Sequence, residues 1–198
     1  MFMQKYKTTI EKPCLEIYYD DDTMSPRENT ILGYFLTKDS NYYSPDGKDN
    51  PILQNIMEET GEIAESLENH IELMTERIQE ETGCHVEDIY PIVKYEHSGV
   101  AYSLGAKHGF DYSNNGFYII TTESKKEMGA EKKDFEMFIE EELNLYNKYV
   151  NGEVYRFVLF DKDGEVEDAC SGFYDIEDIR EHLPKEWAKE SLTDYLIN

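Results

Sequence analysis

Residues 51–82 read PILQNIMEETGEIAESLENHIELMTERIQEET, and the pattern of this stretch predicts one long helix. Its apolar residues recur mainly at steps of three, four or seven, which is the spacing that places side chains on one buried helix face. These residues are Ile52, Ile56, Ile63, Leu67, Ile71, Met74 and Ile78. The helix is expected to end at Gly83 and to bend or break at Gly61, because an internal glycine costs about 1 kcal/mol relative to alanine.

The glutamates of the same stretch form a second stripe. They are Glu58, Glu62, Glu65, Glu72, Glu76 and Glu80, and the clear cation among them is Arg77. Carboxylates four residues apart on a helix repel each other by roughly 0.2 to 0.5 kcal/mol per pair. A helix selected for stability alone would interleave lysines, so we expect the charge to serve an interaction.

Residues 125–150 predict a second amphipathic helix, with Gly152 near its C-terminal cap. The residues expected on its inner face are Phe135, Phe138, Ile139, Tyr146, Tyr149 and Val150. Its outer face includes Glu136, Glu140 and Glu141. Acids toward the C-terminal end of a helix oppose the helix dipole, so this helix also carries an electrostatic cost.

Seven short runs have the composition of β-strands. They lie near residues 14–20, 31–38, 86–98, 100–104, 117–122, 154–160 and 166–174. The last two flank Asp163 and Gly164, and an Asp-Gly pair between apolar runs predicts a β-hairpin. Short helices are expected from Asp175 to His182 and in the tail. The predicted fold class is α+β, a mainly antiparallel sheet with two long acidic helices packed on one side, in a single domain of residues 1–198.

The charge of the chain limits its partners. Its 198 residues include 43 Asp and Glu against 19 Lys and Arg, which gives a formal net charge of −24. Such a charge repels nucleic acid and anionic membranes, and it favours basic partners, including the phosphate-binding surfaces of other proteins. With sixteen Tyr and nine Phe, the chain is too rich in aromatic residues to be a disordered acidic protein.

Cysteine usage and hydropathy predict a soluble, cytoplasmic protein. Cys14, Cys84 and Cys170 include no close pair, which fits reduced thiols better than a disulfide framework or a zinc site. The first residues are polar, and no apolar run approaches the length of about 18 residues that a membrane span needs. We therefore expect neither a signal peptide nor a transmembrane helix.

No group of residues has a spacing diagnostic of a catalytic or metal site. Three consecutive acids, Asp20 to Asp22, could ligate a cation, but a calcium loop needs alternating ligands and a glycine turn, so a solvated loop is expected. His97 and His108 flank a predicted turn without a third ligand or a nucleophile at a useful distance along the chain. We therefore expect no catalytic residue, no metal and no cofactor.

Four segments together resemble a family of uncharacterised proteins encoded by bacteriophages and conjugative elements of Gram-positive bacteria. The segments are SPRENTILG at Ser25–Gly33, YEHSG at Tyr95–Gly99, NGFYIITTE at Asn115–Glu123, and GEVYRFVLFDKDGEVEDACSGFY at Gly152–Tyr174, which REHLPKE follows. The resemblance covers most of the chain outside residues 51–82, so this acidic segment is a candidate family-variable insertion. The family commonly has tryptophan where this chain has Asn29 and Ser171, so contacts made by those rings are not expected here.

The resemblance implies an accessory function of a mobile element, a context in which inhibitors of host defence are common. Our leading hypothesis is an anti-restriction or anti-CRISPR protein that mimics DNA or RNA and occupies the nucleic-acid-binding surface of a host nuclease. It would be no enzyme and would bind neither nucleic acid nor membrane directly. The acids expected to bind this partner are Glu58, Glu62, Glu65, Glu72, Glu76, Glu80, Glu136, Glu140 and Glu141. Duplex DNA carries one charge per about 1.7 Å of its axis, so mimicry requires both stripes on one face, or a homodimer.

Three other functions remain open. The chain could sequester a small molecule such as a signalling nucleotide, with Tyr and Phe stacking on the base, although phosphate binding favours cations or a glycine-rich helix entry. It could be an enzyme that uses His97 or His108. It could also be an accessory regulatory protein with no inhibitory role.

Overall fold

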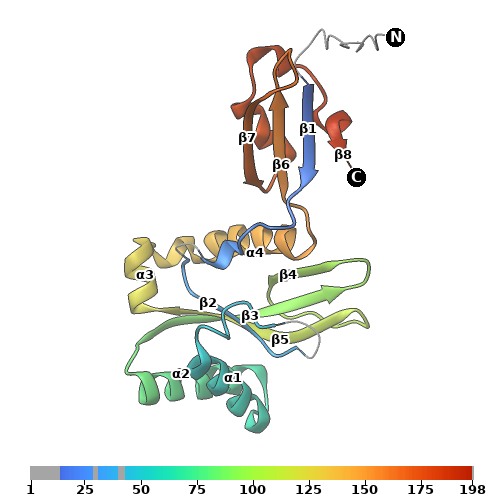
Figure 1. Cartoon of the computed structure of the whole chain (residues 1–198). Helices are drawn as coiled ribbons and strands as arrows, with labels where there is room; N and C mark the ends of the chain where they lie inside the picture. Colours follow the sequence, from blue (N-terminus) through green and yellow to red (C-terminus); the bar gives the residue numbers. More distant parts are fainter. Residues whose placement is uncertain (1–13, 29–30, 40–42, 198) are drawn as a thin grey trace, which may run out of the picture. The chain divides into compact units, whose positions relative to one another are not determined.

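A computed structural model describes residues 14–28, 31–39 and 43–197. Helices and antiparallel strands both form, so the predicted α+β class is confirmed. The chain divides into two compact units. Unit 1 comprises Met1–Ser25 with Lys148–Asn198, and unit 2 comprises Pro26–Asn147. Each unit contains a four-stranded sheet (Figure 1). Each sheet has its own hydrophobic core.

The sheet of unit 1 has the strand order β7-β6-β1-β8. These strands are β1 (Cys14–Tyr19), β6 (Tyr155–Phe160), β7 (Val166–Phe173) and β8 (Leu196–Ile197). β6 and β7 form the antiparallel hairpin that the sequence predicts. At its turn the Asp161 carboxylate accepts the backbone N–H groups of Asp163 and Glu165, both at 2.9 Å, and Gly164 adopts a positive φ of 81°, which favours glycine.

Alternation along the strands of unit 1 gives its sheet one covered face. Leu15 and Ile17 of β1 and Phe157 and Leu159 of β6 are buried, as period-two spacing requires. The short helices η3 (Ile176–His182), η4 (Lys185–Trp187) and η5 (Leu192–Tyr195) contribute Ile179, Trp187 and Leu192 to this core, and β7 contributes Phe173. Trp187 packs there, with its ring 5.1 Å from that of Tyr195. The helical tail is thus confirmed, as short 3-10 turns.

The sheet of unit 2 has the order β2-β5-β3-β4, with every pair antiparallel. Its strands are β2 (Tyr34–Thr37), β3 (Val86–Glu96), β4 (Val100–Leu104) and β5 (Tyr112–Thr121). The expectation of one sheet containing all strands is therefore wrong. An apolar alternating run indicates that a strand exists, but its partner is chosen by tertiary packing.

The acidic stretch 51–82 forms two helices, α1 (Pro51–Ile63) and α2 (Leu67–Thr82). The helix is interrupted before Ser66, which is the N-cap of α2. The Ser66 hydroxyl accepts the N–H of Asn69 at 3.1 Å. Gly61 remains helical, and a Cβ there would lie 3.0 Å from His70 Cε1, so the glycine permits close approach of α2. Ile52 and Ile63, assigned to the buried stripe, are instead exposed.

The second predicted helix is also interrupted, so two long acidic helices are not confirmed. Its N-terminal part forms α3 (Thr122–Met128), which ends at Gly129 in the left-handed region with φ 63°. The turn η2 (Lys132–Asp134) then leads into α4 (Phe135–Val150). A left-handed glycine is a common way to end a helix.

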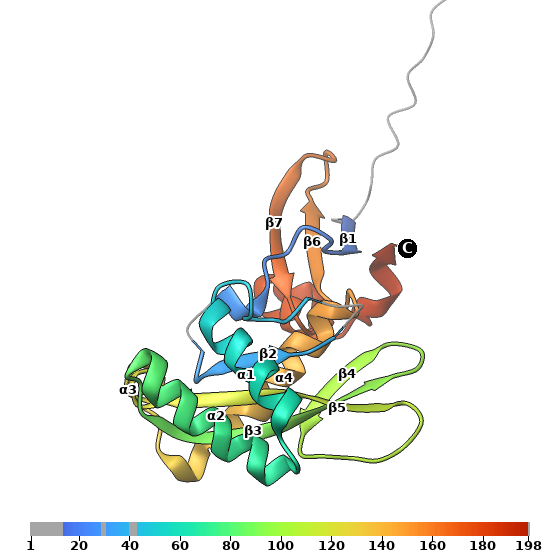
Figure 2. The ribbon, with the colours of Figure 1, turned by 90° about the horizontal axis from the view of Figure 1, so that it is seen from below.

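The helices of unit 2 lie on opposite faces of its sheet. α1 and α2 lie side by side (Figure 2) and pack on Leu36, Phe117 and Ile119. α4 covers the other face, where the ring of Tyr146 lies 5.5 Å from that of Phe35. Neighbouring residues of a strand, such as Phe35 and Leu36, point to opposite faces. The prediction that both helical segments cover one side is therefore wrong.

Candidate protein-binding surface

The Ser25–Gly33 motif places a buried arginine in unit 2. Arg27 lies in the short turn η1 (Pro26–Glu28) and is 8% exposed. Its Nε and Nη2 donate to the two carboxylate oxygens of Asp46 at 3.1 and 2.6 Å, and Nη2 also donates to the Gly33 carbonyl at 2.8 Å. Asp46 in turn pairs with β2, because it accepts the Phe35 N–H at 2.6 Å and donates its own N–H to the Phe35 carbonyl at 3.1 Å.

Glu142 of α4 completes this cluster. Its carboxylate bonds to Arg27 and to the hydroxyl of Tyr118, and it accepts the Leu32 N–H at 2.8 Å. The Tyr118 oxygen accepts the Gly33 N–H at 2.9 Å. Burial raises the pKa of Tyr118. Burial alone would lower the pKa of Arg27, but hydrogen bonds to Asp46 and its charge outweigh burial and raise that pKa. The motif therefore holds η1, β2 and α4 together.

The nine acids expected to bind a partner divide between the two faces of the sheet. Glu62, Glu65, Glu72, Glu76 and Glu80 are exposed on α1, α2 and the break between them, and half-buried Glu58 accepts a hydrogen bond from Gln54. The other three, Glu136, Glu140 and Glu141, are exposed on α4. Since α1–α2 and α4 cover opposite faces, no single face of unit 2 carries all nine.

Three acids of α2 are not neutralised by neighbouring cations. Arg77 binds Glu81, and it also binds Glu59 of α1 at 3.2 Å. Within residues 14–28, 31–39 and 43–197, no ion pair involves Glu72, Glu76 or Glu80. Steps of four residues place these three on one line along α2, about 6 Å apart along its axis. We name them the α2 stripe. The like charges of these residues repel one another. Glu80 also opposes the helix dipole, because it lies near the C-terminal end of α2.

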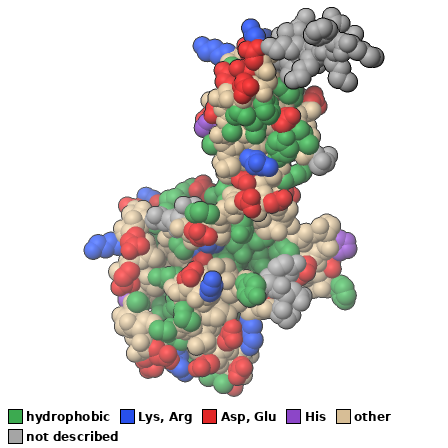
Figure 3. Space-filling view, viewed as in Figure 1, with side chains coloured by type: hydrophobic (Ala, Val, Ile, Leu, Met, Phe, Trp, Pro, Cys, Tyr) green, Lys and Arg blue, Asp and Glu red, His purple; other side chains and the backbone are tan. Residues whose placement is uncertain are grey.

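The wider acidic surface is dispersed. Figure 3 shows one face, on which red acidic side chains of unit 2 alternate with green, tan and blue regions instead of forming one block. Several acids elsewhere in the unit are paired, as in Lys125 with Glu87 at 2.8 Å and Lys132 with Asp88 at 3.0 Å. The α2 stripe is therefore a line of three unpaired carboxylates and not part of a uniformly negative surface. Glu136, Glu140 and Glu141 of α4 likewise have no ion pair among the described residues.

The histidines and the Asp20–Asp22 loop lie at sites with no evident chemistry. His97 has a side chain that is 68% exposed, with Nδ1 3.9 Å from Asp111 Oδ1, and His108 is exposed in a loop. Asp20 accepts the Gly172 N–H at 3.0 Å, which fastens β7. In the part of the chain that the structure describes, no group of three or more His, Cys, Asp or Glu could hold a metal ion.

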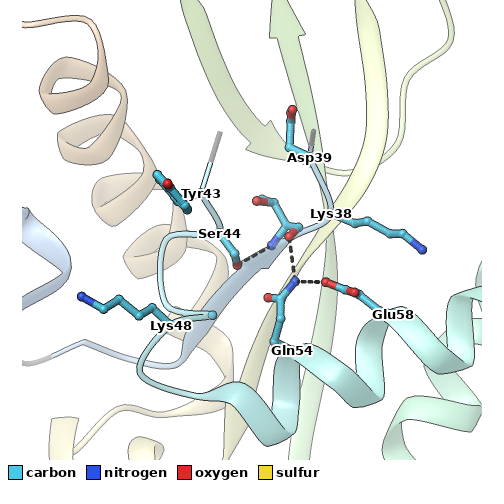
Figure 4. A pocket seen from close by; sticks show the side chains of 9 residues that line it. Lys38, Asp39, Tyr43, Ser44, Lys48, Gln54 and Glu58 are labelled. Carbon is cyan, nitrogen blue, oxygen red and sulfur yellow. Dashed lines mark hydrogen bonds between the residues drawn. The ribbon is translucent and has the colours of Figure 1, made fainter. Parts of the chain in front are cut away.

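A hollow of about 770 Å³ lies where β2 approaches α1. Gln54 crosses its base, and its Nε2 donates to the Thr37 carbonyl at 3.0 Å and to Glu58 at 2.6 Å. Lys38 and Lys48 border the hollow but point to opposite sides (Figure 4). Because phosphate binding needs donors that converge on one point, the arrangement does not favour a nucleotide site here.

Among the described residues, no helix is both long and apolar enough to cross a membrane. Comparison with models of protein families, with curated proteins and with solved structures gives no match.

Proposed function

We propose that this chain is a non-enzymatic protein that binds a basic surface of another protein through the α2 stripe, with Glu62 and Glu65 beside it. The observation that carries the proposal is that Glu72, Glu76 and Glu80 are exposed and have no ion-pair partner among the described residues. Exposed like charges at four-residue spacing destabilise an isolated helix. Their compensation would come from a cationic partner, which also accelerates association.

The partner that best fits these acids is the nucleic-acid-binding surface of a nuclease. Such surfaces present lysines and arginines spaced for phosphates. The resemblance to proteins of phages and conjugative elements supports a host defence enzyme of the restriction or CRISPR type as the target. The protein would then act in the cytoplasm of the bacterial host and inhibit the enzyme by occupying this surface.

Charge density supports a homodimer as the binding form. The α2 stripe carries one charge per about 6 Å of helix axis, whereas one DNA strand carries one per about 3.4 Å. The acids of α4 cannot supply the difference, because they lie on the other side of the sheet. A second copy of α2 placed beside the first would halve the spacing and approach the density of one strand.

The proposal is tested with two variants of equal charge. The first is Glu72→Gln/Glu76→Gln/Glu80→Gln, and the second is Glu136→Gln/Glu140→Gln/Glu141→Gln on α4. Immobilised wild-type protein should capture a nuclease from host lysate at low salt and lose it when salt reduces the Debye length to a few ångströms. The α2 variant should lose capture, and the α4 variant should retain it.

Two results would contradict the proposal. Equal loss of capture by both triple variants would assign binding to net charge instead of the α2 stripe. A captured nuclease that retains full activity in a DNA or RNA cleavage assay would exclude occupation of its nucleic-acid site. Sedimentation velocity on the same preparations checks the proposed dimer.

A further inference from the structure

The outer edge of β4 presents main-chain groups that the sheet does not use. Gly105 donates its N–H to the Pro91 carbonyl at 2.8 Å, and His97 donates to the Gly99 carbonyl at 3.2 Å. These bonds fix the alternation of the β3–β4 ladder, in which every second residue of an edge strand points its N–H and C=O away from its partner. Val100, Tyr102 and Leu104 are the residues of β4 whose main-chain groups point outward.

A side chain of α4 occupies one of these outward positions. Asn147 Oδ1 accepts the Tyr102 N–H at 2.7 Å, and Asn147 Nδ2 donates to the Tyr102 carbonyl at 2.9 Å. The amide thus makes the pair of bonds that a residue of a neighbouring strand would make. The N–H and C=O of Leu104, two residues further along, have no hydrogen-bond partner within the described ranges of the chain.

Leu104 faces a groove of about 410 Å³ between β4 and α4. The edge of β4 forms one wall, and Leu143 and Asn144 of α4 contribute to the other. Leu143 is buried, while Asn144 is exposed and its side-chain amide has no hydrogen-bond partner among the described residues. Lys107 and Glu140 also line the groove and give it one charge of each sign.

We propose that this groove binds a short extended peptide, which pairs with the N–H and C=O of Leu104 as an added strand. A free donor and acceptor on one outward residue match the acceptor and donor of a peptide unit. The amide of Asn144 can bond to the next peptide group, and balanced charges favour a peptide over an anion. Asn147 already pairs with Tyr102, so the added strand is short, and a complete edge strand from a second copy is excluded.

The experiment uses the full-length ¹⁵N-labelled protein and a blocked peptide. N-acetylated, C-amidated tetrapeptide of alternating threonine and valine is titrated to millimolar concentration, and the amide of Leu104 is followed by NMR. Its proton resonance should move downfield and its hydrogen exchange should slow, because the N–H gains an acceptor. The same peptide with one central amide N-methylated lacks a donor and should bind roughly 2- to 12-fold more weakly, as the loss of one hydrogen bond implies.

Matched variants of α4 separate the groove from the rest of the helix. Asn144→Ala should weaken peptide binding, whereas Met137→Ala, an exposed α4 residue that does not line the groove, should leave it unchanged. An unmoved Leu104 amide, or equal affinity for the N-methylated peptide, would overturn the proposal. Binding only of peptides with a free carboxylate would also overturn it, because Lys107 alone would then explain the affinity. None of these outcomes depends on the α2 stripe, so the two proposals fail independently.

Discussion

Carboxylates in two regions of unit 2 differ in their burial and in their pairing with other groups. Asp46 and Glu142 lie around buried Arg27 and accept hydrogen bonds from the backbone of residues 32 and 35. Those of the α2 stripe are exposed and have no partner among the described residues. The first set joins segments that are far apart in sequence, while the second is an electrostatic cost to its own helix. Acid content alone therefore says little about function. Ion pairs and hydrogen bonds distinguish the carboxylates that hold the fold together from those of the α2 stripe.

The largest effect is expected from removal of the buried cation. Arg27→Met leaves buried Asp46 and half-buried Glu142 as uncompensated charges, which should lower the free energy of unfolding by about 3 to 5 kcal/mol. Urea unfolding followed by circular dichroism measures the change. Arg77→Met is the matched control, since it breaks the exposed pairs with Glu59 and Glu81 and should leave stability nearly unchanged. Equal losses in both variants would remove the distinction between the two regions.

A smaller loss of stability is expected when the Tyr118 hydroxyl of the same cluster is removed. Tyr118→Phe removes the acceptor of the Gly33 N–H and a donor to Glu142. An unsatisfied buried donor costs about 1 to 3 kcal/mol, and the ring should still pack in the core. The midpoint of thermal unfolding should fall, and a crystal structure of the variant should show an unchanged backbone. Unaltered stability would mean that the Gly33 N–H finds another partner.

A charge reversal in the α2 stripe should raise the free energy of unfolding instead of lowering it. Glu76→Lys replaces two repulsive four-residue pairs, with Glu72 and Glu80, by attractive ones and should raise the free energy of unfolding by about 1 kcal/mol. The same variant should bind the proposed basic partner more weakly. Gain of stability together with loss of capture would separate a binding surface from a structural one. A variant that is less stable than wild type would indicate that Glu76 has a structural role.

The smallest expected effect is a pH dependence of stability that comes from His70, an α2 residue that bonds to Met57 of α1. Burial lowers the pKa of His70, although its bond from Nε2 to the Met57 carbonyl at 3.0 Å acts in the other direction. Between this lowered pKa and the ordinary value near 6.5, the unfolded chain binds more protons, so stability is full above pH 6.5 and falls as the pH drops through the lowered pKa. Unfolding at pH 7.5 and 5.5 should show a larger loss for wild type than for His70→Gln. Equal losses would assign the pH dependence to carboxylates.

Local patterns predicted the elements better than their arrangement. Alternation at Cys14–Tyr19 and Val100–Leu104 and the turn at Asp163-Gly164 were sufficient to predict β1, β4 and the β6–β7 hairpin. The N-cap function of Ser66 could have been inferred from its hydroxyl ahead of an amphipathic run, and it explains why residues 51–82 are not one helix. The division into two sheets has no local signal, because it depends on pairing between the ends of the chain.

The site residues likewise divide into those that the sequence predicted and those that it did not. Exposure of Glu72, Glu76 and Glu80 follows from helical period, so the sequence was sufficient for the α2 stripe. The opposite placement of α4 was not predictable, because the period of a helix does not say which face of a sheet it covers. The Arg27 cluster joins residues up to 115 positions apart, and the free groups at Leu104 belong to the main chain. Arg27 lies in the Ser25–Gly33 segment, but that segment does not indicate its partners Asp46 and Glu142, and the main-chain groups of Leu104 leave no motif.

Asp46 closes the outer edge of β2 by pairing with both the N–H and the C=O of Phe35. Exposed strand edges are templates for intermolecular pairing, and natural proteins block them with charged side chains and covering loops. Asp46 is held at that edge by Arg27, so a chain lacking this arginine would expose β2 before it unfolds completely. Its characteristic failure in the cell would then be aggregation and loss from the soluble pool, with proteolysis of a monomer as a secondary fate.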